Sequence, residues 1–261
     1  MDNTQIYNIS IISMILTYFF ASIILLLHIL IKTSLAKDFF ISLLKMSLQL
    51  LAAGYILIYI FHLNLFYLNT IVYLFMCFSA SRIIYKKARI KIKRIFYITL
   101  FVITSIDFII ILGFLIFISK PSPFYDARYF IPIAGMILGN TMNSAVLALN
   151  HFFGRLTKDK KVIEAYLSCG ATTYESCKFL VKDALKVAIL PALANMSGIG
   201  VVSLPGMMTG QILSGINPII AVKYQISIMI AINSGVTYVS LLLLILSVKN
   251  SFNKFYQLIY D

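Results

Sequence analysis

The stretch RLTKDKKVIEAYLSCGATTYESCKFLVKDALK, from Arg155 to Lys186, decides the fold. It is charged, yet the segments before and after it are apolar and long enough to cross a bilayer, so it must lie outside the hydrocarbon. Gly170 is expected to end one helix within it, and Thr172 with Glu175 has the Ser/Thr-x-x-Glu form of a capping box. We therefore predict a pair of structured helices between two spans, and such a pair invites a protein partner.

The composition around this stretch is that of a membrane protein. Hydrophobic residues make up 61% of the 261 residues and charged residues 12%, whereas soluble domains carry about 25% charged residues. We predict an all-α, polytopic membrane helix bundle that forms one transmembrane domain over residues 1–261, because helices pair their own backbone groups in lipid. About seven spans are expected, at residues 7–31, 39–61, 65–83, 95–119, 128–151, 185–204 and 221–248.

The net charge of +13 is distributed unevenly between the predicted connections. Lys120, Arg128 and Lys223 lie on one side of the membrane. The other basic residues fall on the opposite side, at Lys32, Lys37, Lys45, Arg82, Lys86, Lys87, Arg89, Lys91, Lys93, Arg94, Arg155, Lys158, Lys160, Lys161, Lys178, Lys182, Lys186, Lys249 and Lys254. The positive-inside rule then predicts a cytoplasmic C-terminus and an N-terminus outside, with the basic loops facing anionic lipid and not nucleic acid.

A few polar residues inside or between the spans are candidates for a translocation path. Asp107 is the only acid within a predicted span, and a buried acid in lipid suggests function, although it can also pair with a neighbour. Asn140 and Asn143 recur near helical spacing and either line a path or hydrogen-bond neighbouring helices. Gly135 and Gly139 form a close-approach pattern on the same segment.

The segment Ser203–Pro218 is apolar but contains two prolines and three glycines, so we expect a short, bent element at the outer face. Gln211 is a further tentative path residue there. Met207 and Met208 offer soft thioether ligands to a metal or, alternatively, pack in the core.

The sequence carries no motif of the common enzymes. There is no phosphate-binding Gly-x-x-x-x-Gly-Lys-Ser/Thr, no His-Glu-x-x-His and no Gly-x-Ser-x-Gly. The three histidines are scattered, and the three cysteines form no metal or redox motif. We therefore expect no catalytic residue, no bound metal and no cofactor on this chain, which is predicted to be a conduit driven by energy from elsewhere.

Two groups of motifs resemble known transporters. Glu164, Ala165, Gly170 and Ala171 are similar to the cytoplasmic EAA-x-x-x-G signature of ABC transporter permeases, with Tyr166 at the second alanine. In that family the signature forms a coupling helix that docks on the ATPase. The resemblance assigns ATPase coupling to Glu164, Ala165, Gly170, Ala171 and Thr172.

The wider match resembles the Fet-type (FetB) permeases, bacterial ABC exporters associated with iron, and the plant aluminium-tolerance permeases. It rests on IPIAGMILGNTMN (Ile131–Asn143), VSLPGMMTGQILSGINP (Val202–Pro218) and AVKYQI (Ala221–Ile226). The resemblance implies a homodimeric permease in the bacterial inner membrane that exports iron, a related metal or a small solute. Two copies of a separate ATPase subunit would bind the ATP and Mg.

Two other functions stay open from the residues. An ion-coupled secondary transporter would need acids in the membrane, where the sequence offers Asp107, and an inverted repeat, which we do not find. A non-transporting scaffold that transmits an ATPase signal would need an outer docking element, for which 203–218 is the candidate. The short outer loops argue against the scaffold.

Overall fold

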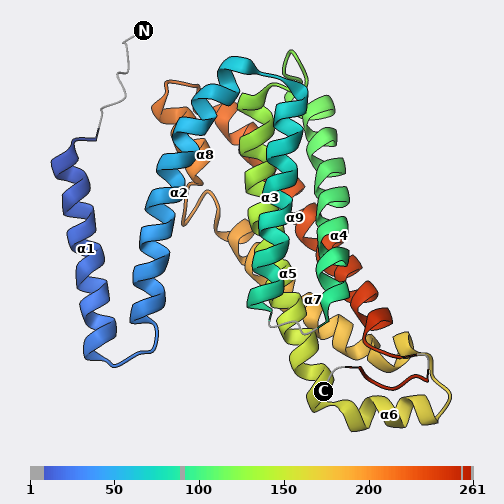
Figure 1. Cartoon of the computed structure of the whole chain (residues 1–261). Coiled ribbons are helices and arrows are strands. Elements are labelled where there is room, and N and C mark those ends of the chain that lie inside the picture. Colours follow the sequence, from blue (N-terminus) through green and yellow to red (C-terminus); the bar gives the residue numbers. More distant parts are fainter. Residues whose placement is uncertain (1–8, 89–91, 254, 260–261) are drawn as a thin grey trace. The chain divides into compact units, whose positions relative to one another are not determined.

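The computed structural model describes residues 9–88, 92–253 and 255–259, and most of these residues are helical. The elements in order are α1 (Ile11–Leu30), α2 (Ala36–Leu63), α3 (Phe66–Lys87), α4 (Lys93–Gly113), the π-helix η1 (Phe114–Ser119), α5 (Ala127–Lys158), α6 (Lys160–Ser168), α7 (Thr173–Gly198), α8 (Gly206–Leu213) and α9 (Pro218–Asn250). They form two compact units, one built on α1 and α2 and the other on the helices from α3 onward (Figure 1).

The first unit is a helical hairpin of α1 and α2. The Ser10 side chain caps the start of α1 by accepting a hydrogen bond from the Ser13 backbone N–H, and the Tyr18 hydroxyl donates to Ser47 Oγ across the hairpin at 2.7 Å. None of the described residues of α1 is buried. A helix that is apolar on all sides and unburied is suited to lipid.

The second unit is a bundle in which α5 and α9 are central. The α5 helix packs against α3, α4, α7 and α9, and α9 packs in addition against α4 and α7. Gly135 faces α3, where an added Cβ would lie at an ordinary contact distance of 3.5 Å from Cε of Met76, so the packing of α3 on α5 does not require a glycine here. The residue before each of these two helices caps it: Asp126 accepts from the Arg128 N–H, and Asn217 from the Ile219 N–H.

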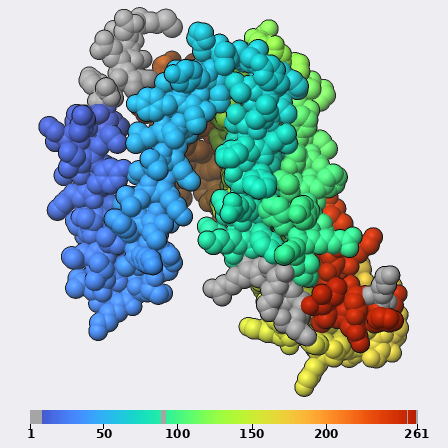
Figure 2. All heavy atoms as spheres, in the orientation of Figure 1, coloured from blue at the N-terminus to red at the C-terminus, as the bar shows by residue number. Residues whose placement is uncertain are grey.

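The outward face of α3 and α4 carries large apolar side chains. Tyr97, Phe101 and Ile109 on α4 are each about two-thirds exposed. Side chains of these two helices form most of the upper part of the second unit that is visible in Figure 2. Exposure of an apolar surface of this extent to water would be unfavourable, so it indicates a lipid-facing side of the bundle.

The prediction of an all-α membrane helix bundle is confirmed. Six described helical segments are long and apolar enough to cross a membrane: α1, α2, α3, α4 with η1, α5 and α9. They match six of the seven predicted spans, except that residues 7 and 8 of the first span lie outside the described residues. The predicted count of about seven is approximate: the span predicted at 185–204 is not among the six, and only its part up to Gly198 lies in α7.

The α7 helix joins two parts that the sequence analysis had separated. It begins within the charged stretch at Thr173 and continues for 26 residues into the span predicted at 185–204. This helix is not interrupted by Lys178, Lys182 and Lys186, because Lys is a good helix former. The second helix of the predicted pair is therefore the extension of a bundle helix.

Basic residues gather at one end of the second unit. Lys86 and Lys87 end α3, Lys158 ends α5, and Lys249 lies at the end of α9. In Figure 1 these helix ends point toward the end of the unit where α6 lies, whereas the loop between η1 and α5 lies at the opposite end. The bundle thus keeps the charge asymmetry of the sequence, although Arg89, Lys91 and Lys254 lie outside the described residues.

Candidate functional site

The connection between α6 and α7 is a tight, fully hydrogen-bonded turn. Gly170 has a φ of +88°, in the left-handed region that favours glycine. Its N–H donates to the Leu167 carbonyl at 3.0 Å, and the Ala171 N–H donates to the Tyr166 carbonyl at 3.1 Å. These two bonds define a Schellman motif, which satisfies the last carbonyls of α6 and fixes the direction in which the chain leaves it.

The next residue, Thr172, opens α7 with the capping box that the sequence predicts. The Glu175 N–H donates to Thr172 Oγ1 at 3.3 Å, and Glu175 Oε2 accepts from the Thr172 N–H at 2.8 Å. The Thr172 hydroxyl also donates to Glu175 Oε2 at 2.7 Å. One helix end is thus closed and the next begun within three residues, so the two helices leave the turn at a fixed angle.

The capping box makes the stability of this turn dependent on pH. The Thr172 hydroxyl, the Thr172 backbone N–H and the charge of Lys178 lower the pKa of Glu175 below its ordinary value of 4.5. Because the pKa is lowered in the folded state, the stabilisation is complete above pH 4.5 and is lost as the pH falls through the folded-state pKa. At neutral pH we expect the wild type to have a higher melting temperature than the Glu175→Gln variant. In acid this difference should vanish. Thermal unfolding of both proteins across this pH range measures it; a difference independent of pH would contradict the assignment.

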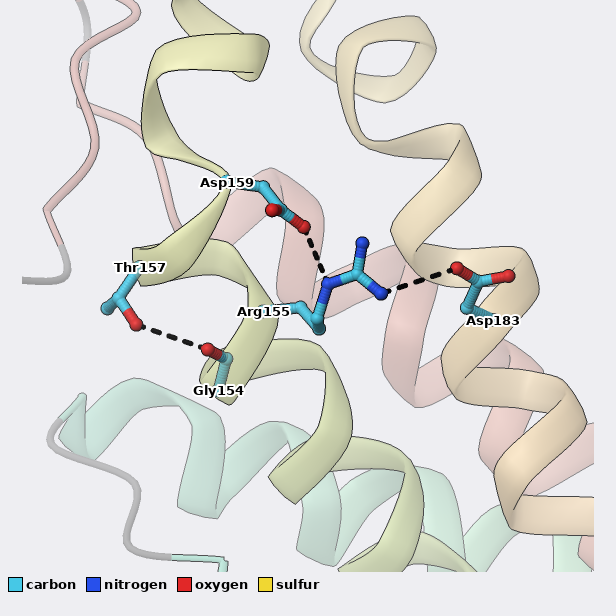
Figure 3. A network of polar contacts seen from close by, with 5 residues as sticks. All are labelled: Gly154, Arg155, Thr157, Asp159 and Asp183. Atoms are coloured by element: carbon cyan, nitrogen blue, oxygen red, sulfur yellow. Dashed lines mark hydrogen bonds and ion pairs between the residues drawn. The ribbon is translucent and has the colours of Figure 1, made fainter.

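A charged cluster fixes the end of α5 to both neighbouring helices (Figure 3). Arg155 Nε donates to Asp159 Oδ2 at 2.6 Å, and Arg155 Nη1 lies 3.7 Å from Asp183 Oδ2 on α7. These side chains are partly exposed, so each ion pair contributes about 1 kcal/mol or less. The cluster chiefly sets geometry, because one guanidinium spans the α5–α6 junction and α7.

The α6 helix is anchored on one side and open on the other. Ile163 is fully buried, and the Tyr166 ring lies 6.4 Å from the Phe179 ring of α7. The open side carries a shallow depression lined by Lys161, Val162, Ala165, Tyr166 and Cys169. Val162 and Tyr166 are each about half exposed. The helix therefore presents a small apolar stripe at the end of the bundle where the basic residues gather.

The coupling residues assigned from the sequence lie together at this helix and its turn. Glu164 and Ala165 are exposed on α6, while Gly170, Ala171 and Thr172 form the connection to α7. The contribution of Arg155 was missed by sequence analysis. Its spacing to Asp159 gave a signal for a pair within one helix, but its approach to Asp183 depends on the packing of α5 against α7.

The tentative path residues are not brought together. Met207 and Gln211 line a polar cavity beside the loop between η1 and α5, whereas Met208 lines a separate apolar cavity with Gln225. The two neighbouring methionines therefore line different cavities. Asn140 and Asn143 line neither cavity.

Asn140 and Asp107 are engaged within the bundle. Asn140 Nδ2 donates to the Met136 carbonyl of its own helix at 2.7 Å. Asp107 is fully buried, and its Oδ2 accepts a hydrogen bond of 2.8 Å from Thr141 Oγ1. Its Oδ1 faces Gly235, where an added Cβ would lie 3.2 Å away. This contact of α4, α5 and α9 is a packing junction, and Gly235 gave no sign of it in the sequence.

No group of three or more His, Cys, Asp or Glu side chains is placed to hold a metal ion within the described ranges. The features that stand out are instead the exposed stripe of α6, its fixed turn and two cavities at other places in the bundle. Fold and site together define a multi-pass membrane helix bundle with an exposed helix at one end.

Comparison with known proteins agrees with this class. The chain belongs to the uncharacterised protein family UPF0014, whose model matches residues 11–252. It is 33% identical over 228 residues to the probable iron export permease protein FetB of Escherichia coli (strain K12). The aligned region covers 87% of this chain and 86% of that protein. No solved structure matches it significantly.

Two further relatives span most of the chain. The UPF0014 membrane protein YjkA of Bacillus subtilis (strain 168) is 32% identical over 95% of this chain and 97% of its own length. Protein ALUMINUM SENSITIVE 3 of Arabidopsis thaliana is 31% identical over 86% of this chain and 81% of its own length. The resemblance to Fet-type and plant permeases is thus confirmed.

Proposed function

We propose that this chain is the membrane-spanning permease subunit of an ABC transporter, acting without an ATPase site of its own. Two copies of the chain would associate with two copies of a cytoplasmic ATPase that binds ATP and Mg. The cargo is iron, a related metal or a small solute, and the direction is export, in keeping with the name of the bacterial relative. The chain would lie in the bacterial inner membrane with its N-terminus outside and its C-terminus in the cytoplasm.

The observation that carries this proposal is the apolar stripe of α6 on a rigidly held support. Its side chains are exposed on a helix that also carries charged residues and lies beside the basic helix ends. An apolar stripe in such a place is suited to a protein partner. Because α5 and α7 run from this helix directly into the bundle, a displacement of α6 reaches both of them.

The two alternatives have less support. An ion-coupled transporter needs a membrane acid that water or ions can reach, whereas Asp107 is fully buried and bonded to Thr141. A signal-transmitting scaffold needs an outer docking element, and we find no feature on α8 that favours a protein partner over a small ligand.

The proposal is tested by placing a charge on the stripe. Ala165→Asp would bury a carboxylate in the apolar contact, which is expected to weaken binding of the ATPase by more than about tenfold. The measurement is co-purification of the tagged chain with the candidate ATPase, together with ATP hydrolysis by the complex.

Ser168→Asp is the matched control, because Ser168 is exposed on the same helix but does not line the depression. We expect this control to bind the ATPase like the wild type. The proposal is wrong if no ATPase of this class is recovered, or if labelling places α6 on the outer surface of the cell.

A further inference from the structure

A polar cavity of about 640 Å³ lies beside the loop between η1 and α5, which is at the opposite end of the second unit from α6 in Figure 1. It is formed by the loop between η1 and α5, the first turns of α5, and α8. Its lining includes Ser119, Lys120, Asp126, Arg128, Met207 and Gln211. These segments are distant in sequence, so the cavity exists only in the folded bundle.

The charge of this cavity is positive. Lys120 and Arg128 are two of the three basic residues outside the basic end of the chain, and both are exposed. Neither forms an ion pair with any residue that the structure describes. Asp126 is the one carboxylate in the lining, and its Oδ1 already accepts the Arg128 backbone N–H at 3.0 Å as the cap of α5.

Two further features favour a negatively charged occupant. The cavity lies at the N-terminus of α5, a 32-residue helix whose dipole places partial positive charge there. The Ser119 hydroxyl oxygen is buried and has no hydrogen-bond partner among the described residues. A buried hydroxyl without a partner is costly, and a bound oxyanion would supply its acceptor.

We propose that this cavity is a binding site for an anionic group, a carboxylate or a phosphate, held between Lys120 and Arg128. The Arg128 guanidinium can donate two parallel hydrogen bonds to such a group, and the Lys120 ammonium supplies a second positive charge. Ser119 completes the set with a neutral donor. The same chemistry occurs in soluble organic anions and in the phosphate headgroups of lipids.

The site bears on the cargo, and this step rests on the proposed function. A bare metal cation would be repelled by Lys120 and Arg128 at this end of the bundle. A metal that passes through this cavity would therefore travel as a complex of net negative charge. An organic anion would meet the same favourable field.

The binding site is tested with the purified full chain in nanodiscs of phosphatidylcholine, using citrate and inorganic phosphate as probes in calorimetry. We expect both probes to bind, and binding to weaken as salt is raised. The double variant Lys120→Gln with Arg128→Gln removes two charge-assisted contacts and is expected to bind about a hundredfold more weakly. Lys223→Gln removes the third basic residue of that end, which does not line the cavity, and should bind like the wild type.

A second set of nanodiscs containing phosphatidylglycerol identifies the source of the anion. Unchanged binding of citrate and phosphate there assigns the site to a soluble anion. Blocked binding, with phosphatidylglycerol retained by the wild type but not by the double variant, assigns it to a lipid headgroup. The inference is overturned if the wild type binds none of the three, or if Lys223→Gln weakens binding as much as the double variant. The assay contains no ATPase, so its failure is distinguishable from a failure of ATPase docking.

Discussion

Replacing Gly170 by valine is expected to uncouple ATP hydrolysis from transport while leaving the chain inserted in the membrane. At φ +88° an L-residue meets its own carbonyl, which costs about 1–2 kcal/mol and more for a β-branched side chain. The turn would open to relieve this strain, and α6 would lose the two Schellman hydrogen bonds that fix its direction. A change of 1–2 kcal/mol alters a conformational equilibrium by about 5- to 30-fold, and transport should fall by that order.

The expected effect of Gly170→Val can be separated from steric crowding by the added side chain. An added Cβ at Gly170 would meet nothing within 4 Å, so the penalty is one of backbone conformation alone. Asparagine tolerates the left-handed region, and Gly170→Asn should therefore recover most of the transport. Gly154→Ala is the control, since this exposed helical glycine also has open space and ordinary φ. Transport and ATP hydrolysis are measured in proteoliposomes with the ATPase, and normal transport by Gly170→Val would refute the role of the turn.

The features that the sequence predicted well are local ones. The capping box of Thr172 with Glu175 and the turn at Gly170 depend on residues within five positions of each other, so their types determine the geometry. The apolar spans can be predicted equally well, because the length that a helix needs to cross lipid is fixed. The last predicted span, 221–248, lies wholly within α9.

The features that it could not predict depend on how the helices pack. The continuity of α7 through the charged stretch is not evident from the sequence, because its lysine-rich part has the composition of a surface helix and the rest that of a membrane helix. The approach of Arg155 to Asp183 needs α5 and α7 side by side. Similarly, Met207 and Met208 line different cavities because of the orientation of α8, which a Met-Met pair in sequence does not reveal.

At Gly235, α9 lies close to both α4 and α5. A Cβ there would lie 2.9 Å from the Thr141 methyl, 3.2 Å from Asp107 Oδ1 and 3.3 Å from Cγ2 of Ile137. The first distance would be a steric clash, and all three neighbouring atoms belong to buried residues. The absence of a side chain at this position therefore sets the distance of α9 from α4 and α5.

Gly235→Ala is expected to destabilise the second unit by about 1–3 kcal/mol, because the added methyl group overpacks the junction and disturbs the Thr141–Asp107 hydrogen bond. Thermal unfolding of the purified chain is the measurement. Gly139→Ala is the control: a Cβ there meets nothing within 4 Å, and the change should be neutral or stabilising. Equal melting temperatures for Gly235→Ala and the wild type would refute the junction.

Asp107→Asn separates packing from ion coupling at the same junction. Asparagine keeps an oxygen that accepts from Thr141 Oγ1 but cannot carry a proton between two states. If Asp107 serves packing alone, this variant folds and transports like the wild type, and the ion-coupled alternative is removed. Loss of transport with unchanged melting temperature and ATPase binding would instead give the carboxyl group a part in moving the cargo, because a purely structural residue cannot produce that combination.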